Sequence, residues 1–479
     1  MLVQELFQAK LSETPNRIFI RYEERDFTFE EVWSEIEKVA AKLKSAGLRA
    51  LDRVLVCEWN NPRFVFFYFG VLLAGGVVVT VSPLLTWEEL SKIHQLSGSR
   101  LWLGQSGLEF EDFFIYELKL DPVSEDLCDP RCDLQVIIYT SGTTADPKGV
   151  MLTEQNIRAQ IWLASQAIDL RSEDRLLSTL SLSHVFGQMD LLWLSLYKGC
   201  SLRLMPHFEA REVLRFLLLD QITILIAVPT MYRLLIRGLA EKQSAFPALR
   251  LCHTGAAPLT SDLFWKIKDA FGLIPQQGYG LTETCSMAFS NPLLGACKDR
   301  SVGLPLPGVE LLILSESGES LGAGEIGEVV LRGEIISPGY LGNPEATSQA
   351  GLDQGFLKTG DLGYRDEENY LFLVDRVKDM INHSGFKVYP SEVEEIIRAH
   401  PAVREVVVIG IDSELRGQKI KAILELEAEY YHQKAQVTES LRRLCDHKLA
   451  RYKRPHQFEI ISEIPKTPSG KLLRRKFDR

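Results

Sequence analysis

Phosphate-binding side chains are concentrated in a short stretch between residues 138 and 150. Its order is Ile138-Tyr139-Thr140-Ser141-Gly142-Thr143-Thr144-Ala145-Asp146-Pro147-Lys148-Gly149-Val150. Hydroxyl and backbone N–H groups donate to phosphate oxygens, glycine lets the backbone approach closely, and lysine offsets negative charge. The apolar run Val136-Ile137-Ile138 precedes it. We therefore predict a buried strand that ends in a polar, mobile loop suited to a triphosphate.

This loop differs from the Walker A phosphate loop. A Walker A loop has glycine before its lysine and serine or threonine after it. Here Pro147 precedes Lys148 and Gly149 follows it. A surface turn rich in Gly, Ser and Thr is the alternative interpretation of the residues alone.

A second candidate segment, Gly278-Tyr279-Gly280-Leu281-Thr282-Glu283-Thr284, offers complementary chemistry. Tyr279 presents a flat face to a base, and Thr282 can donate to phosphate. Glu283 can hold Mg²⁺, a hard cation that takes carboxylate oxygen. Taken by itself, the segment also fits a glycine turn followed by a helix cap.

The elements that must position these segments alternate between strand and helix patterns. We predict strands at 53–57 and 222–228, with another at 249–252 before a glycine-bearing turn, and a helix from Glu30 to Ala46 that stops at Gly47. Such alternation predicts parallel sheets covered by helices, with ligands at the carboxyl ends of the strands.

The predicted fold class is α/β, with two domains. Residues 1–377 are predicted to form a large domain of parallel-rich sheets covered by helices, with a small β subdomain around 324–340. Residues 378–479 are predicted to form a small α+β domain. Its helix is predicted to begin with Ser391 as N-cap and Glu394 completing a capping box, followed by a strand at 405–411.

Composition narrows the functional classes. The chain has 479 residues, 46% hydrophobic and 25% charged, as in a soluble globular protein, and its net charge of −10 argues against nucleic-acid binding. Eight scattered cysteines without a CxxC pair, and no signal peptide, predict a reducing cytoplasmic location. Residues 64–81 carry no charge, but Gly75-Gly76 interrupts them. We predict a buried helix through about Ala74 and a strand at 77–81, with no transmembrane segment.

Together the two segments resemble the phosphate loop and the adenine segment of the adenylate-forming superfamily, which includes acyl-CoA synthetases, peptide-synthetase adenylation domains and luciferases. The resemblance implies that Tyr279 contacts adenine and that Thr282 and Glu283 act in catalysis, with Glu283 and Thr144 holding Mg²⁺. It implies an ATP-binding set made of Thr140, Ser141, Gly142, Thr143, Thr144 and Lys148. The family usually has glycine where this chain has Ala145, which stiffens the loop slightly.

Three further segments match the same family. Lys358-Thr359-Gly360-Asp361 resembles its ribose segment, and Arg376 lies where the family places a second ribose or phosphate contact; a surface salt bridge is the alternative for Arg376. Gly255 and Ala256 resemble the stretch that lines the adenine and acyl pockets. His184, in Ser183-His184-Val185-Phe186-Gly187, resembles the residue beside the acyl carboxylate.

The C-terminal part of the resemblance implies a moving catalytic loop. Pro465-Lys466-Thr467-Pro468-Ser469-Gly470-Lys471 matches the loop whose lysine, here Lys471, is catalytic. The resemblance places the hinge between the two half-reactions at Lys378. It also places Ser384, Gly385 and Phe386 along the pantetheine tunnel of CoA. Asn382 and Lys387 depart from residues common in coumarate ligases and luciferases.

The resemblance implies an AMP-forming acid:CoA ligase that uses ATP, Mg²⁺ and CoA. Acetate-activating relatives close the pocket with tryptophan near the adenine tyrosine, whereas small Gly278 precedes Tyr279 here, so an acyl chain longer than acetate or an aryl acid is predicted to fit. Of these two, a medium or long fatty acid is favoured. An α-amino acid is not expected, because His184 replaces their aspartate. The alternatives are transfer to the phosphopantetheine of an acyl carrier protein, a luciferase-like oxygenase, and a catalytically silent nucleotide-binding module.

Overall fold

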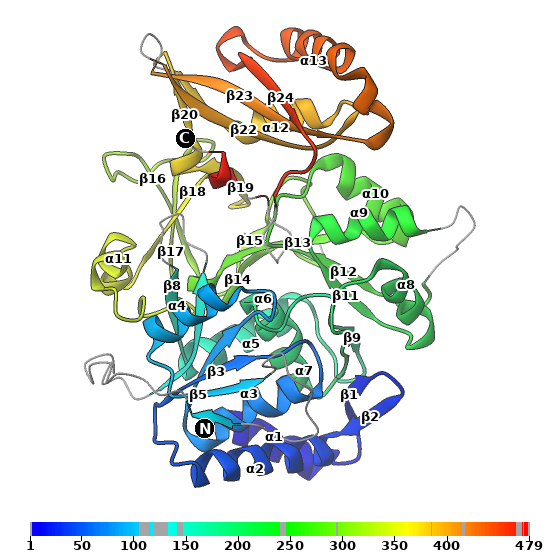
Figure 1. Ribbon diagram of the computed structural model, residues 1–479, viewed down its shortest axis with the longest axis vertical. Helices are drawn as coiled ribbons and strands as arrows, with labels where there is room; N and C mark the ends of the chain where they lie inside the picture. Colours follow the sequence, from blue (N-terminus) through cyan, green and yellow to red (C-terminus); the bar gives the residue numbers. More distant parts are fainter. Residues whose placement is uncertain are drawn as a thin grey trace. The chain divides into compact units, whose positions relative to one another are not determined.

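The computed structural model describes residues 2–104, 115–117, 133–140, 147–239, 246–293, 296–384, 386–413, 417–465, 472 and 474–477. The chain forms two compact units (Figure 1). The first unit contains residues 1–311 and 331–357, and the second contains residues 312–330 and 358–479. Residues 324–330 of the predicted β subdomain thus fall in the second unit and residues 331–340 in the first. The domain boundary at Lys378 stays a prediction.

A six-stranded sheet in the first unit carries the phosphate-loop segment. Its order is β6-β5-β3-β4-β7-β8, with β5, β3, β4 and β7 parallel and the two outer pairs antiparallel. Leu90 and Ile93 of α4 pack on one face of this sheet. The strands are β3 (Arg53–Cys57), β4 (Val77–Val81), β5 (Leu101–Gly104), β6 (Ile115–Glu117), β7 (Leu134–Thr140) and β8 (Lys148–Thr153).

A nine-stranded sheet carries the second candidate segment. Its order is β15-β14-β13-β12-β11-β9-β10-β1-β2, and the pairs from β13 to β1 are parallel. Side chains of α8, α9 and α10 form one apolar core with β11 and β12; Figure 1 shows the three helices on this part of the sheet. The strands are β1 (Ile18–Tyr22), β2 (Arg25–Thr28), β9 (Arg175–Leu177), β10 (Ser201–Arg203), β11 (Ile224–Ala227), β12 (Leu251–Thr254), β13 (Gln276–Leu281), β14 (Ser286–Ser290) and β15 (Leu304–Pro305).

Several helices of the first unit, α2 and α3 among them, begin and end at recognisable caps. In α2, Thr28 and Glu31 form a capping box, and the backbone leaves the helix before Gly47, whose φ is 80°. The helices are α1 (Leu2–Glu13), α2 (Phe29–Ser45), α3 (Pro62–Ala74), α4 (Trp87–Ser97), α5 (Glu154–Ala167), α6 (Val185–Gly187), the π-helix η2 (Gln188–Trp193), α7 (Leu194–Lys198), α8 (Ala210–Leu219), α9 (Pro229–Gly238), α10 (Ser261–Phe271) and α11 (Pro344–Gln349).

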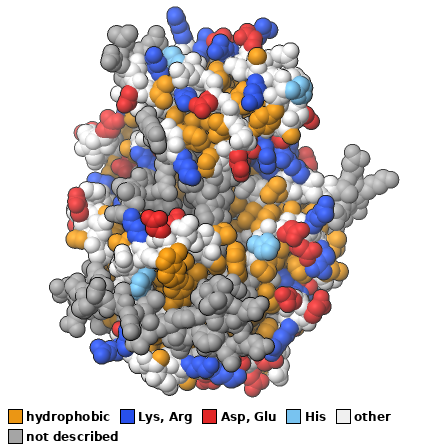
Figure 2. All heavy atoms as spheres, viewed as in Figure 1, with side chains coloured by type: hydrophobic (Ala, Val, Ile, Leu, Met, Phe, Trp, Pro, Cys, Tyr) orange, Lys and Arg blue, Asp and Glu red, His pale blue; other side chains and the backbone are white. Residues whose placement is uncertain are grey.

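The uncharged stretch at 64–81 folds as predicted. It supplies α3 and then β4, separated by Gly75 in the left-handed conformation, with φ of 90°. Over the described ranges, no helix is long and apolar enough to cross a membrane. Acidic and basic side chains are interspersed on the face shown in Figure 2. The whole chain has 54 Lys and Arg residues and 64 Asp and Glu residues.

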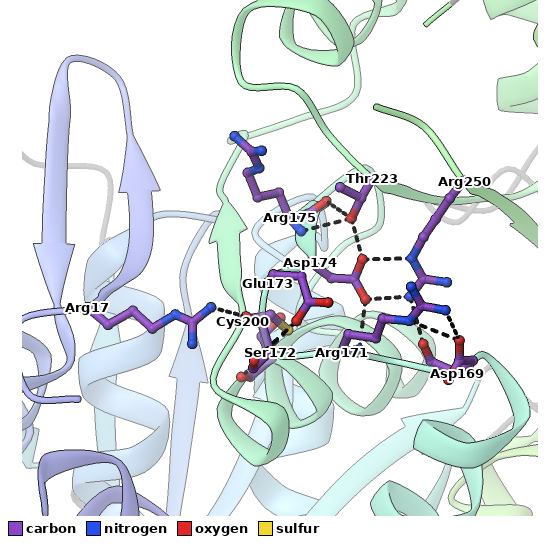
Figure 3. Close-up of polar contacts among 11 residues, drawn as sticks. Arg17, Asp169, Arg171, Ser172, Glu173, Asp174, Arg175, Cys200, Thr223 and Arg250 are labelled. Carbon is purple, nitrogen blue, oxygen red and sulfur yellow. Dashed lines mark hydrogen bonds and ion pairs between the residues drawn. The ribbon is translucent and has the colours of Figure 1, made fainter. Parts of the chain in front are cut away.

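A buried polar network ties together the amino ends of three parallel strands of the nine-stranded sheet (Figure 3). Asp174 precedes β9, Thr223 precedes β11, and Arg250 precedes β12. Asp174 accepts hydrogen bonds from Thr223 Oγ1 at 2.7 Å, Arg250 Nε at 2.9 Å and the Arg171 backbone N–H at 2.7 Å. Because ligands of such sheets bind at the carboxyl ends, this network has a structural role.

Asp174→Ala is expected to lower the free energy of unfolding at pH 7 by about 3 kcal/mol, because Arg250 loses the partner of a buried ion pair. Burial alone would raise the pKa of Asp174, but hydrogen bonds from Arg250, Thr223 and Arg171 outweigh it and lower that pKa. The folded state therefore gains from the ionised form above the unfolded pKa, and this gain disappears as pH falls. Urea unfolding measures this effect. The difference in unfolding free energy between the wild type and Asp174→Ala should be smaller in acid than at pH 7.

Asp169→Asn provides the matched control for that measurement, because asparagine tolerates the φ of 45° that Asp169 adopts. Asp169 pairs with Arg171 on the surface, with side chains 54% and 53% exposed, so its loss should change stability little. Equal destabilisation by the two substitutions would contradict the role of the buried network.

The second unit contains two sheets. The four-stranded sheet β16-β17-β18-β19 has one strand, β17, within the range 324–340 predicted as a small β subdomain, and β20 to β24 form the C-terminal sheet with α12 and α13. Its elements are β16 (Glu310–Leu314), β17 (Gly327–Arg332), β18 (Leu357–Arg365), β19 (Leu371–Arg376), β20 (Ile381–His383), β21 (Phe386–Val388), α12 (Pro390–Arg398), β22 (Val403–Ser413), β23 (Gly417–Leu426), α13 (Lys434–Lys448) and β24 (Gln457–Ile461).

The predicted capping box of α12 is wrong. The N-cap is Tyr389, without a side-chain capping bond. The Ser391 hydroxyl instead donates to the Val374 carbonyl at 2.5 Å. Glu394 is buried and accepts the Val408 backbone N–H at 2.7 Å. Contacts with distant strands therefore replace the local pattern.

Candidate active site

The strands flanking the phosphate loop are antiparallel neighbours. Thr140 at the end of β7 pairs with Lys148 at the start of β8, and Thr140 Oγ1 donates to the Lys148 carbonyl at 3.4 Å. Val136, Ile137 and Ile138 are at most 3% exposed, which confirms the predicted buried strand. The two ends of the loop are thereby held together. Ser141, Gly142, Thr143, Thr144 and Ala145 lie outside the described residues.

Tyr340 brings Lys148 and Glu283 together. Its hydroxyl donates to Glu283 Oε1 at 2.8 Å, and Lys148 Nζ lies 5.0 Å from the centre of its ring. Backbone bonds fix this arrangement: Ser337 N donates to the Glu283 carbonyl at 2.8 Å, and Leu341 N donates to the Gly149 carbonyl at 2.8 Å. Burial, and then the charge of Glu283, raise the pKa of Tyr340, so its hydroxyl stays a donor. Sequence reasoning missed Tyr340; its only local signal was the preceding Pro338-Gly339 turn.

A tight turn fixes the position of Glu283. Thr282 and Glu283 lie in a short 3₁₀ turn, Thr282–Thr284, between β13 and β14. A Cβ on Gly280 would lie 1.5 Å from the Ser286 carbonyl oxygen, so only glycine fits there. Thr284 Oγ1 closes the turn by donating to the Ser286 carbonyl at 2.8 Å. Tyr279, on β13, is 9% exposed and packs on Phe289 with ring centres 5.9 Å apart.

The donor set fits Mg²⁺ carried by a phosphate ligand. Mg²⁺ is usually held by one or two carboxylates together with substrate phosphates, rather than by a cage of protein ligands. Glu283 is half-buried and has one oxygen oriented by Tyr340. Within the described ranges, no cluster of three His, Cys, Asp or Glu side chains could hold a metal by itself. The second predicted metal residue, Thr144, lies outside those ranges.

The segments predicted to line the acyl pocket converge. The Phe186 ring lies 6.2 Å from the His253 ring, and a Cβ on Gly255 would lie 3.4 Å from Phe186 Cζ. His184, the N-cap of α6, is half-buried, and its Nδ1 accepts the Phe186 backbone N–H at 3.4 Å. Ala256 has φ of 65°, a strained conformation for a residue with Cβ and one that concentrates at functional sites.

Gly278 makes room for His253 rather than for an acyl chain. A Cβ on Gly278 would lie 3.0 Å from His253 Cε1. His253 is 1% exposed, and its Nδ1 lies 3.2 Å from Gln276 Oε1. Burial lowers the pKa of His253 to about 4, so the ring is neutral at pH 7. The small size of Gly278 therefore does not support a long acyl chain, which corrects that part of the sequence argument.

Asp190 is a buried acid that sequence reasoning missed. It lies in the π-helix directly after the His184 segment, and it is 0% exposed. Its Oδ2 accepts a hydrogen bond from Ser286 Oγ, whereas its Oδ1 has no partner in the part of the chain that the structure describes. Burial raises the pKa of Asp190 to about 7. Only the position of an acid within an apolar run, Met189 to Leu194, could have signalled it.

Asp190→Asn is expected to stabilise the protein more at pH 8 than at pH 5. The folded pKa lies above the unfolded value of 3.8, so the stability contributed by this group is complete below pH 4 and is lost as pH rises through 7. An asparagine at this position does not titrate. The difference in unfolding free energy between Asp190→Asn and the wild type should therefore change by about 2 kcal/mol from pH 5 to pH 8. Urea unfolding of both proteins at pH 5 and pH 8 measures it. A difference independent of pH would contradict the raised pKa.

The second unit carries the predicted ribose and hinge residues. Asp361 and Arg376 pair across β18 and β19, with Arg376 Nε donating to Asp361 Oδ1 at 2.9 Å. Lys378 is exposed in the 3₁₀ turn Val377–Asp379. Phe386 is 53% exposed and stacks on Tyr452 with ring centres 4.5 Å apart.

Ser384 is exposed, with φ of 53°. Gly385 and Lys471 lie outside the described residues. The structure thus brings Asp361 and Arg376 together in the second unit, as it brings Lys148 and Glu283 together in the first.

Comparison with known families identifies this combination of fold and site. The family model described as AMP-binding enzyme matches residues 7–341, and the model of the AMP-binding enzyme C-terminal domain matches residues 392–471. The chain therefore belongs to the AMP-binding enzyme family. This confirms the predicted membership of the adenylate-forming superfamily and its resemblance to acyl-CoA synthetases.

Relatives and solved structures match along almost the whole chain. A long-chain-fatty-acid–CoA ligase of Bacillus subtilis (strain 168) is 31% identical, over 99% of this chain and 93% of the relative. A 2-succinylbenzoate–CoA ligase of Bacillus licheniformis is 32% identical, over 97% of each. Among solved structures, the anthranilate CoA ligase AuaEII with anthranoyl-AMP has a TM-score of 0.87 and 28% identity, over 99% of this chain and 96% of that one. ATP-bound MatB from Rhodopseudomonas palustris has a TM-score of 0.86 and 26% identity, over 98% and 97%.

Proposed function

We propose that this chain is an AMP-forming acid:CoA ligase that activates a carboxylic acid with ATP and transfers the acyl group to CoA. The meeting of Lys148 and Glu283 at Tyr340 carries the proposal. Both side chains contact Tyr340, which supports one site for the lysine assigned to phosphate and the carboxylate assigned to Mg²⁺, inside a family-matched fold. Relatives named as CoA ligases, and a relative solved with ATP and magnesium, support the use of ATP, Mg²⁺ and CoA.

In the first half-reaction the acid carboxylate attacks the α-phosphorus of ATP. Two anions approach each other, so positioning and charge neutralisation dominate catalysis. We assign charge neutralisation to Lys471, and binding of the departing pyrophosphate to the loop from Thr140 to Lys148. Mg²⁺ held through Glu283 would offset phosphate charge. The products are acyl-adenylate and pyrophosphate.

The remaining predicted residues bind, orient or move the substrates. Tyr279, Gly255 and Ala256 are assigned to adenine, and Thr282 to a phosphate oxygen. Asp361 and Arg376 are assigned to the ribose, whose hydroxyls can donate to the carboxylate. His184 is assigned to the acyl carboxylate.

In the second half-reaction the CoA thiol attacks the acyl carbon of the adenylate, and AMP leaves with the electron pair of the broken bond. We assign the pantetheine path to Ser384, Gly385 and Phe386. A change of orientation at Lys378 would remove Lys471 before the thiol arrives. Hinges of this kind need only a few residues that absorb the backbone change.

The acid is the finer part of the proposal. The relative that is a long-chain-fatty-acid–CoA ligase favours a medium or long fatty acid. Relatives named for 2-succinylbenzoate, coumarate and anthranilate keep an aryl acid as the second candidate. We also propose a cytoplasmic location, which rests on cysteines that are free, such as the buried Cys57 and Cys252.

Pyrophosphate release tests this function. Saturated fatty acids from acetate to octadecanoate, benzoates, cinnamates and 2-succinylbenzoate are each supplied with ATP and Mg²⁺, with and without CoA. Acid-dependent release that turns over steadily only with CoA is the expected result, and the best acid identifies the substrate class. One burst unchanged by CoA would indicate a carrier-protein acceptor instead. No release with any acid would contradict the proposed activity for these substrate classes.

A further inference from the structure

The predicted hinge lies between two ion pairs within the second unit. On its amino side, Arg376 Nε contacts Asp361 Oδ1 at 2.9 Å and holds the end of β19 to β18. On its carboxyl side, Asp379 Oδ2 contacts Arg474 Nε at 3.7 Å. Residues 377 and 378 are the stretch between these pairs. A rotation confined there leaves both pairs intact.

Arg474 is itself anchored in the body of the C-terminal sheet. Its Nη1 donates to Glu394 Oε1 on α12 at 2.7 Å and also to the Val408 carbonyl on β22. The Val408 N–H donates to the same Glu394 oxygen at 2.7 Å. The side chains of Arg474 and Glu394 are 23% and 8% exposed, so most of this contact is shielded from water. One guanidinium therefore joins α12, β22 and the residue after the hinge.

Apolar contacts hold the same C-terminal residues. Leu472 and Phe477 pack on a cluster that includes the buried Ile409 and Ile423 of the sheet. Ile464, in the same cluster, is 0% exposed, and its N–H donates to Glu425 Oε2 at 2.9 Å. The described residues Ile464 and Leu472, which lie before and after residues 466–471 in the sequence, thus both pack on the C-terminal sheet. In Figure 1 its red end lies beside β19 and β20.

We propose that Arg474 is a positioning residue that couples the segment carrying Lys471 to the hinge at Lys378. The role of Lys471 in this inference rests on the proposed function. With Arg474 in place, Asp379 moves as one body with α12 and β22. Rotation at Lys378 is then passed to α12, to β22 and to Arg474, which follows Lys471 by three residues.

A purely structural role for Arg474 makes a different prediction about Asp379. The pair with Asp379 is 3.7 Å long and has no hydrogen-bond geometry, whereas the pair with Glu394 is 2.7 Å long, so the pair with Asp379 contributes less to folding stability. The buried pair with Glu394 is the one on which stability depends. Asp379→Asn therefore separates the two roles: it should leave stability nearly unchanged while it releases the hinge from Arg474.

The experiment combines hydrogen exchange with the two half-reactions. In Asp379→Asn, the amides from Lys378 to Ile381 should exchange about fivefold faster, a size typical of coupled pairs. Acyl-adenylate formation should slow by about the same factor in kcat, without a change in KM for ATP. Arg474→Ala should show both effects, and Arg474→Lys should partly restore them.

A double-mutant cycle tests the coupling directly. In the Arg474→Ala background, Asp379→Asn should have no further effect, because its partner is already absent. Additive effects would overturn the proposal, as would unchanged exchange in Asp379→Asn. Matched controls are Asp446→Asn and Arg443→Ala, whose side chains form exposed ion pairs elsewhere in the C-terminal part and should change neither readout.

The exchange measurement does not depend on the reaction. If no acid supports pyrophosphate release, the proposed function fails, whereas the cycle measured by exchange still decides whether Arg474 couples the hinge to the C-terminal segment. If adenylation occurs but Lys471→Ala leaves it intact, the link to catalysis is overturned.

Discussion

Lys471→Ala is expected to abolish acyl-adenylate formation, lowering kcat by about a thousandfold, while thioester formation from preformed acyl-adenylate continues. The first half-reaction brings a carboxylate toward a polyphosphate, and a fixed cation at the α-phosphate stabilises the charge that develops. The second half-reaction starts from a mixed anhydride and needs no such cation. ATP–pyrophosphate exchange measures the first step, and CoA consumption from supplied acyl-adenylate measures the second.

The matched control for this prediction is Lys448→Ala. Lys448 is exposed at the end of α13 and carries the same charge, so both half-reactions should keep their rates. Equal loss of both half-reactions in Lys471→Ala would contradict the assigned role and point instead to a folding defect.

Local sequence patterns predicted the elements that are held by their own residues. The strands Arg53–Cys57 and Val77–Val81 occur where they were expected, because nearly every side chain in them is buried and apolar. The helix before Gly47 ends where glycine permits the left-handed conformation. Segments with one dominant local cause were therefore predictable.

Features created by distant contacts were not predictable in the same way. Ser391 and Glu394 have the spacing of a capping box, but Glu394 is engaged by Arg474, 80 residues later. Tyr340 belongs to the site because it reaches Glu283, 57 residues away. Gly278 suggested an open pocket until its neighbour His253, on β12, filled the space. In each case the deciding partner lies on another element, so its effect is absent from the local pattern.

The residue types of the site and their arrangement in space differ in how far the sequence predicts them. The order of hydroxyls, glycines and a lysine predicted the phosphate loop. The carboxylate that follows Tyr279, Glu283, was predicted to hold Mg²⁺. The sequence did not predict that Lys148 and Glu283 both contact Tyr340. That arrangement depends on backbone hydrogen bonds from residues 337–341 to β8 and to Glu283. The chemistry of single residues could be predicted from the sequence, whereas their arrangement in space was known only from the folded structure.

Lys378→Pro is expected to spare acyl-adenylate formation and to slow thioester formation by about a hundredfold. Proline fixes φ near its usual value and also restricts the preceding residue, Val377. These two residues lie between the ion pairs Arg376–Asp361 and Asp379–Arg474, so they are the ones left to absorb a rotation. Locking them should hold the C-terminal part in one orientation.

Lys378→Ala is the control that separates backbone freedom from side-chain chemistry. Alanine removes the ammonium but keeps φ and ψ free, so thioester formation should continue at nearly the wild-type rate. If alanine and proline slow the second half-reaction equally, the side chain of Lys378 matters rather than its backbone. An unchanged second half-reaction in Lys378→Pro would exclude a hinge at this position. The rotation would then have to break one of the two flanking ion pairs, and salt should accelerate it because screening weakens exposed pairs.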